Sequence, residues 1–149
     1  MVKNHFTATG IVFNARNEIL MIRHNKLKVW LPPGGHIDEN ELPDHAVLRE
    51  ILEETGIEAA LIPSKKLDLP YELTLPFVIL LEDIEGDGTH NHIDMIFLCR
   101  ALSGELKPCK SEVNGIGWFT FEQIKQLDTF DNVLKTIVKA IEYLNVNPK

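Results

Sequence analysis

Residues 48–57, with the sequence LREILEETGI, decide how this chain folds and raise a question about its charges. The apolar residues recur at helical spacing, and Gly56 is typical of the residue that follows a last helical turn. In a helix, Glu50, Glu53 and Glu54 share one stripe, because about 100° per residue brings positions i, i+3 and i+4 together. Like charges at this spacing repel, and anions are disfavoured near the negative end of the helix dipole.

Two interpretations of this acidic stripe are open. An ordinary solvated helix face explains the exposure of the glutamates but not their placement, since such faces usually interleave basic residues. The nearest base, Arg49, stands on the weaker, N-terminal side of Glu53. A divalent cation would instead cancel the repulsion, and hard carboxylate oxygens suit Mg²⁺ or Mn²⁺. Sites where a sequence breaks local rules are candidates for function.

The pattern around the stripe predicts a helix from about Pro43, a favoured first-turn residue, to Thr55. The apolar side of this helix should pack on the core, while the three glutamates face outward into a cleft or solvent. The residues expected on the apolar side are Val47, Leu48, Ile51, Leu52 and Thr55.

Strands are predicted before and after this helix in the sequence. Residues 26–43, between the second strand and the helix, are rich in Pro and Gly and should form a loop. The strands at residues 5–14 and 19–25 should pair as a hairpin. The strand at residues 92–102 should be central in the sheet, because its middle is apolar on both faces. A short helix should start at Thr120 or Phe121, and an amphipathic helix should cover residues 132–144. The predicted strands are HFTATGIVFN (5–14), ILMIRHN (19–25), EAALIP (58–63), TLPFVILLED (74–83), HIDMIFLCRAL (92–102) and GIGWFTF (115–121).

These elements mix strands and helices without strict alternation, which predicts one α/β domain over residues 1–149 with helices on both faces of a mixed sheet. The net charge of −7 and the absence of a basic tract argue against nucleic acid and anionic membranes as partners. The longest apolar run is too short to span a bilayer. With no secretory pattern and two cysteines, Cys99 and Cys109, we expect a reduced, cytoplasmic protein.

The three glutamates also belong to a longer pattern, G-x5-E-x7-R-E-U-x-E-E-x-G-U with U aliphatic, which runs from Gly35 through Glu41 to Ile57. Its chance probability is on the order of 10⁻⁹ per starting position at average residue frequencies. The pattern resembles the signature of the Nudix (MutT-like) hydrolases, with every fixed position filled. Trp30 with the glycines ahead of the pattern, and an acidic segment before Trp118, extend the likeness. The resemblance implies the Nudix fold, a mixed sheet sandwiched between helices.

The resemblance also implies an activity and a metal site. Family chemistry cleaves the pyrophosphate bond of a nucleoside diphosphate linked to another group, X, through attack of water on phosphorus with Mg²⁺, for which Mn²⁺ can substitute. Carried over by position, Glu50, Glu53 and Glu54 resemble the metal ligands, and the carbonyl of Gly35 resembles a frequent additional ligand. Arg49 resembles the arginine that pairs with a glutamate of the pattern and fixes its rotamer.

The general base stays open between two residues. Glu112 lies six residues before Trp118 and matches the acid that many members carry outside the conserved pattern. Glu50 is the alternative, since a ligand carboxylate can also accept a proton from water. Glu41 is expected to tether the loop to the helix.

Several other side chains are candidates for substrate or metal binding. His90, His92 and Asp94 alternate along a strand and so share a face, which leaves a zinc site, a substrate contact and a plain structural role open. His36 follows the glycines and is placed to approach a phosphate. The residues expected along a substrate cleft are His24, Trp30 and Tyr71, whose aromatic rings could stack on a base.

The alternative to a hydrolase is a sensor domain of the same fold that binds nucleotides without cleaving them. Such domains typically lose glutamates of the conserved pattern, and none is lost here. An isomerase would need catalytic residues outside the pattern, of which the sequence gives no sign. The partner implied is a small nucleoside diphosphate derivative, while the identity of X and the formation of a homodimer are left open.

Overall fold

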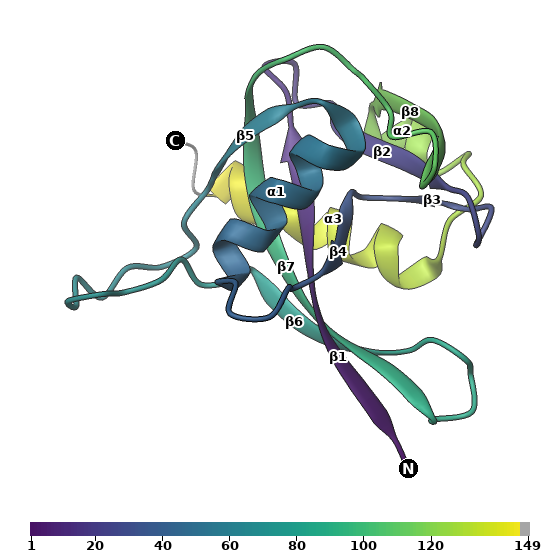
Figure 1. The fold of residues 1–149 in the computed structure, drawn as a ribbon. Coiled ribbons are helices and arrows are strands. Elements are labelled where there is room, and N and C mark those ends of the chain that lie inside the picture. The colour runs from purple at the N-terminus through teal and green to yellow at the C-terminus, as the bar shows by residue number, and fades with distance from the viewer. Residues whose placement is uncertain (147–149) are drawn as a thin grey trace.

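The computed structural model describes residues 1–146 and has a large mixed sheet with helices on both faces (Figure 1). The sheet has eight strands, and the first helix lies between the fourth and fifth strands of the chain. The elements are β1 (Lys3–Phe13), β2 (Ile19–His24), β3 (Trp30–Leu31), β4 (Gly34–His36), α1 (Pro43–Thr55), β5 (Glu58–Leu61), β6 (Val78–Asp83), β7 (His90–Ser103), β8 (Val113–Phe119), α2 (Phe121–Ile124) and α3 (Asp131–Val146).

Strand β7 is the centre of the sheet, as its apolar sequence predicts. It pairs in parallel with β1 from Lys3 opposite His90 to Phe13 opposite Arg100. Its other edge pairs antiparallel with β5 and β6, one after the other along its length. The central position explains why the middle of β7 is apolar on both faces, since helices cover both sides of it.

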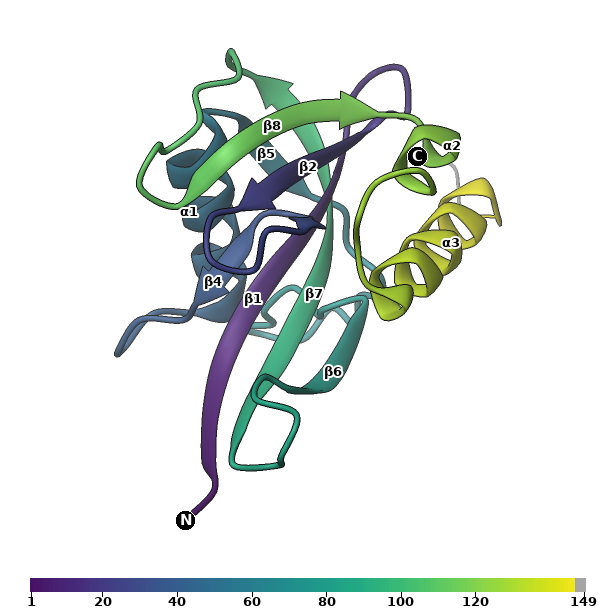
Figure 2. The ribbon, with the colours of Figure 1, turned by 90° about the vertical axis from the view of Figure 1, so that its right-hand side faces the viewer.

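The predicted hairpin of β1 and β2 forms only at its closed end. The two strands pair at Phe13 and Ile19 and then diverge. Beyond that point β2 pairs with β8 and β3, whereas β1 pairs with β4. Figure 2 shows β2 and β8 side by side, at an angle to β1 and β7. Strands β3 and β4 lie in residues 26–43, which the sequence assigns to a loop; segments of two and three residues are too short to show periodicity.

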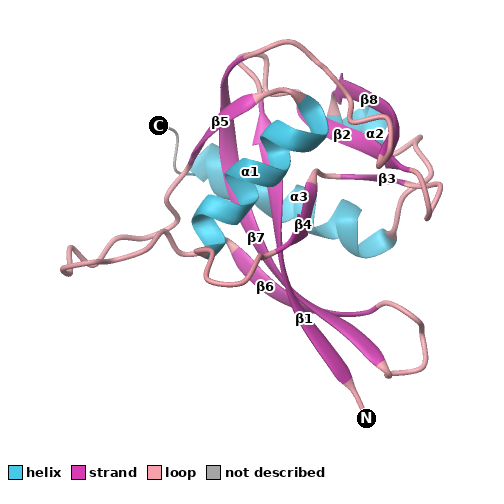
Figure 3. Ribbon diagram, in the orientation of Figure 1, coloured by secondary structure: helices cyan, strands magenta, loops and turns pink. Residues whose placement is uncertain are grey.

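Two apolar cores lie on opposite faces of the sheet, which confirms the predicted layers. Helix α1 packs on one face through Ala46, Val47 and Ile51. Helix α3 covers the other face, with Ile137 and Ala140 fully buried, and α2 packs beside it (Figure 3). No helix within residues 1–146 has both the length and the apolar character needed to cross a membrane.

Helix α1 has the predicted bounds, but its buried side is rotated from the prediction. Leu52, expected in the core, is 48% exposed, whereas Glu54, expected to face outward, is 4% exposed. The buried stripe runs through Val47, Ile51 and Glu54, at i, i+4 and i+7. Glu54 contacts neighbouring segments through both its backbone and its side chain: its carbonyl accepts the N–H of Cys109 at 3.2 Å, and its carboxylate accepts the N–H of Gly34 at 3.0 Å.

Gly56 ends α1 in the left-handed conformation, with φ of 76°, and its N–H donates to the Leu52 carbonyl. An added Cβ would lie 2.7 Å from the Glu105 carbonyl oxygen. We therefore expect Gly56→Ala to lower the free energy of unfolding by about 2 kcal/mol or more, measured by urea denaturation.

Gly86→Ala is the matched control for this substitution. Gly86 has the same φ of 76° but nothing within 4 Å of an added Cβ, so only the backbone strain of about 1 kcal/mol should appear. Equal losses in the two variants would show that the close approach of Glu105 to the helix end contributes nothing.

Candidate active site

The three glutamates of α1 differ in environment although they share one stripe. Glu54 is buried, and one of its carboxylate oxygens accepts the backbone N–H of Gly34 at 3.0 Å. The side chain of Glu50 is 13% exposed and that of Glu53 is 57% exposed. The stripe therefore runs from the protein interior to solvent, and the wholly solvated face considered from the sequence is excluded.

Arg49 holds this acidic group together. Its guanidinium donates two hydrogen bonds to Glu41, at 2.7 and 2.9 Å. The same group donates to Glu50 at 2.8 Å, to Glu53 at 3.1 Å and to the His36 carbonyl at 3.0 Å. A planar guanidinium with five N–H donors can make this set of contacts, whereas a lysine ammonium cannot. Glu41 also accepts the backbone N–H of Asp38, so it tethers the loop to the helix as expected.

Replacing Arg49 with Lys keeps the charge but removes the fork of donors. We expect Arg49→Lys to lower the free energy of unfolding by about 2 kcal/mol, because hydrogen bonds to charged groups contribute roughly 1.5–3 kcal/mol each and a lysine retains only part of them. Urea denaturation without added metal measures this. Arg16→Lys is a suitable control, since Arg16 is 77% exposed and pairs only locally with Glu18. A loss no larger than the control's would show that the network does not stabilise the fold.

Burial makes the ionised forms of Glu54 and Glu50 less favourable. Desolvation raises the pKa of Glu54 to about 8, against the hydrogen bond from Gly34, and the charges of Glu50 and Glu112 raise it further. Desolvation also raises the pKa of Glu50, although its bond to Arg49 acts in the opposite direction. A cation bound nearby would stabilise the ionised form of these two carboxylates and would lower their pKa values again.

Gly35 brings the backbone of β4 against this group. A Cβ built on Gly35 would lie 2.6 Å from the carboxyl carbon of Glu50, so a larger residue here would displace that carboxylate from its present position. Carboxylate and carbonyl oxygens are the ligands that hard divalent cations prefer, and the donor set of Gly35, Glu50, Glu53 and Glu54 therefore fits such an ion. Hydrogen bonds to Arg49 and Gly34 hold the three carboxylates in the structure described.

Glu112 lies near these glutamates although it is distant in sequence. The loop before β8 is fixed to the end of α1 by the bond from the Cys109 N–H to the Glu54 carbonyl, and the Glu112 carbonyl accepts the N–H of Asn25. The side chain of Glu112 is exposed, and its charge is close enough to raise the pKa of both Glu50 and Glu54.

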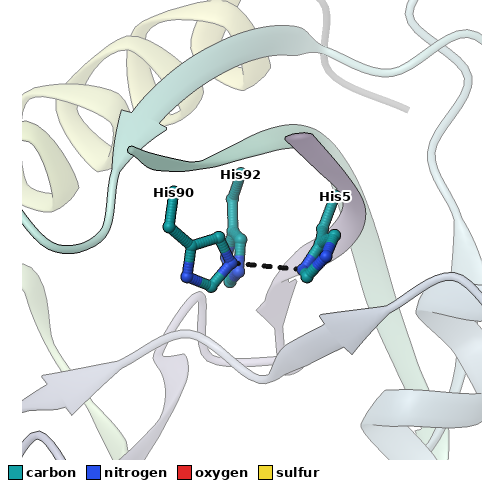
Figure 4. A group of neighbouring side chains, drawn as sticks. All are labelled: His5, His90 and His92. Atoms are coloured by element: carbon teal, nitrogen blue, oxygen red, sulfur yellow. Dashed lines mark hydrogen bonds between the residues drawn. The ribbon is translucent and has the colours of Figure 1, made fainter. Parts of the chain in front are cut away.

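The histidine and aspartate residues of β7 do not form the His90, His92 and Asp94 group considered from the sequence. Asp94 is buried and accepts hydrogen bonds from the hydroxyls of Thr7 and Thr9, both at 2.9 Å. His5 of β1 joins His90 and His92 instead, and the three rings face one another (Figure 4). His36 also lies in this cluster, with its ring centroid 5.0 Å from that of His92.

Sequence reasoning does not find His5, because only strand pairing reveals its place. The parallel register sets His5 opposite His92, and a single strand carries no signal of that register.

The three residues expected along a substrate cleft lie in different parts of the structure. The ring of Trp30 packs edge-to-face on Phe119, with centroids 5.2 Å apart, and belongs to the core beneath α3. His24 lies near Glu112, whose charge acts on its pKa, although burial lowers that pKa more strongly. Tyr71 is fully exposed in the loop between β5 and β6.

The fold and the site define a class: a mixed sheet between helices, with one helix presenting a carboxylate cluster held by an arginine. A family profile described as the NUDIX domain matches residues 3–141. The chain therefore belongs to the NUDIX family, and the fold expected from the resemblance is confirmed.

Known relatives agree with this assignment. A solved NUDIX-family hydrolase from Clostridium perfringens is 30% identical, covers 95% of this chain and 97% of its own, and superposes with a TM-score of 0.80. A MutT-like protein of Streptomyces ambofaciens is 27% identical over 120 residues, which is 80% of this chain and 66% of that protein. An 8-oxo-dGTP diphosphatase of Proteus vulgaris is 33% identical over 84 residues, which is 50% of this chain and 74% of that protein. The chain spans about a third to about three quarters of the length of the curated relatives it matches.

Proposed function

We propose that this chain is a Mg²⁺-dependent Nudix pyrophosphohydrolase that cleaves the pyrophosphate bond of a nucleoside diphosphate linked to another group, X. The observation that carries the proposal is the intact carboxylate group of α1, partly desolvated, gathered around Arg49 and placed against the backbone of Gly35. A structural helix face would not bury Glu54 at the end of a helix without a positive partner.

Glu50, Glu53 and Glu54, with the carbonyl of Gly35, would hold the Mg²⁺, and Mn²⁺ is the expected substitute. When bound, the metal neutralises phosphate oxygens and lowers the pKa of the attacking water. Arg49 positions two of these glutamates through its hydrogen bonds, so we assign it the role of fixing their rotamers.

We propose Glu112 as the general base that accepts the proton of the attacking water. Its carboxylate is exposed and its charge acts on Glu50 and Glu54, so it lies where it could accept a proton from water next to the metal site. Glu50 is the alternative base. One of its oxygens already accepts a hydrogen bond from Arg49, which leaves less of its capacity for a proton.

Substrate contacts are proposed for His36, His92 and Trp30. The first two lie in the histidine cluster and Trp30 packs beneath α3, so these contacts require part of the substrate to reach the face of the sheet opposite α1. The relatives named as 8-oxo-dGTP diphosphatases make oxidised nucleoside triphosphates the first substrates to examine.

A panel of nucleotides tests this function. Oxidised and normal nucleoside triphosphates, ADP-ribose, dinucleoside polyphosphates and nucleotide sugars are each incubated with the protein and Mg²⁺, and phosphate is measured after coupling to pyrophosphatase or phosphatase. We expect at least one compound to be cleaved, with activity lost on chelation. Tight binding of a nucleotide with no cleavage at any Mg²⁺ or Mn²⁺ concentration would favour the sensor alternative.

A further inference from the structure

A second group of metal-ligand side chains lies away from the carboxylates of α1. In β4, the backbone of Gly35 approaches Glu50 on the α1 side, while the ring of its neighbour His36 lies with His5 and His92. Successive residues of a strand point to opposite faces, so the histidine cluster lies on the other side of the sheet from the acidic group. His90 and His92 share this face with Ile96 and Leu98, which pack in the core under α3.

The register of the sheet builds the cluster. His5 lies opposite His92 in the parallel pair of β1 and β7, and His36 lies opposite Thr7 in the pair of β4 and β1. One nitrogen from each of His5, His90 and His92 lies within 4.8 Å of the other two. This is the only group of three or more such ligands that gathers so closely within residues 1–146.

One nitrogen of the cluster is available to a ligand. The Nε2 of His92 is buried and has no hydrogen-bond partner in the structure, which is unusual for a buried polar atom. The Nε2 of His90 and the Nδ1 of His5 lie 3.2 Å apart and share a hydrogen bond, which a bound metal ion would replace (Figure 4). The other ring nitrogen of His90 lies 3.6 Å from a carboxylate oxygen of Glu85, so a small movement of this exposed carboxylate would let it orient the imidazole.

We propose that His5, His90 and His92 bind one transition-metal ion of the Zn²⁺ class through three imidazole nitrogens, with the remaining position open to water or to His36. Three histidines are an established ligand set for zinc, whereas Mg²⁺ prefers oxygen. The ion would link the first residues of β1 to the first residues of β7, where β1 is exposed. Zinc binding here does not depend on the pyrophosphohydrolase activity proposed above, although His92 and His36 are also the substrate contacts proposed there.

Zinc titration of the tag-free protein by calorimetry, with Mg²⁺ in large excess, tests the proposal. We expect one Zn²⁺ per chain in the wild type. Loss of partners that only orient a ligand typically weakens metal binding 10–100-fold, so loss of a ligand in His5→Ala, His90→Ala or His92→Ala should weaken it at least about 100-fold. The same variants should lose the visible absorption of bound Co²⁺ and the rise in melting temperature that Zn²⁺ gives the wild type.

Two controls separate this site from others. His45→Ala removes an exposed histidine of α1 and should leave zinc binding unchanged. Glu54→Gln should also leave it unchanged, because the carboxylate group lies on the other face of the sheet. Zinc binding that persists in His5→Ala and His90→Ala, or that is lost in Glu54→Gln, would overturn the proposal. His5 is exposed, so its variant should fold even if His92→Ala does not.

Discussion

Glu54→Gln is expected to lower turnover at least about 100-fold while leaving the protein folded. Glu54 is a buried carboxylate with one hydrogen-bond partner, the Gly34 N–H, and a glutamine oxygen can accept the same bond. The substitution therefore removes the ability to become a negatively charged ligand when a metal binds, and little else. Loss of a single preorganised electrostatic group typically costs 10²–10³ in rate. Without metal, the variant should unfold at the same temperature as the wild type or a higher one, because a desolvated acid has been removed.

The measurement is kcat on the best substrate of the nucleotide panel, together with a thermal unfolding curve without metal. Glu53→Gln should cause a comparable loss of rate with no change in stability, since Glu53 is largely exposed. Glu39→Gln, in the exposed loop before α1, is the control that should change neither quantity. Wild-type turnover in both Glu53→Gln and Glu54→Gln would remove these residues from the metal site.

Glu112→Gln should lower kcat by 10²–10⁴-fold with little change in Mg²⁺ affinity, because a general base contributes a factor of this size. The amide cannot accept the proton of the attacking water. If Glu112 were a metal ligand instead, raising the Mg²⁺ concentration should restore much of the lost rate. If it were only a surface residue, neither quantity should change more than about threefold, which corresponds to roughly 0.65 kcal/mol.

Glu50→Gln measured beside it distinguishes the two candidate bases. Glu50 is also a proposed ligand, so its loss should weaken metal binding and turnover together. The acidic limb of the pH profile of kcat gives a second reading, since it should shift in whichever variant has lost the base, provided that chemistry limits the rate. Near-wild-type kcat for Glu112→Gln at every Mg²⁺ concentration would assign the base to α1.

The elements with strong local signals were predicted well from the sequence. Helix α1 begins at Pro43 and ends at Thr55 as predicted, because a first-turn proline and a glycine cap mark its two ends. The central position of β7 followed from its apolar middle, and Thr120 caps α2. The motif also indicated the contact of Arg49 with the glutamates, which the structure contains.

The features that depend on pairing between distant segments were not predicted. Glu54 is buried where its carboxylate meets Gly34 and its carbonyl meets Cys109, and both neighbours are distant in sequence. His5 joins the histidine cluster only through the register of β1 against β7. The short strands β3 and β4 exist because longer neighbours provide their hydrogen bonds. Local patterns in a sequence carry none of this information.

The guanidinium of Arg49 gives the acidic helix a counter-ion of its own. Because that positive charge is covalently part of the chain, folding of α1 need not wait for a cation from solution, in contrast to small domains that are unfolded until zinc binds. Folding and loading with metal are then separate events. A chelator should therefore abolish activity without unfolding the protein. An incoming metal ion must compete with Arg49, which already contacts Glu50 and Glu53, and this competition favours a metal ion that exchanges with solution over one that stays bound.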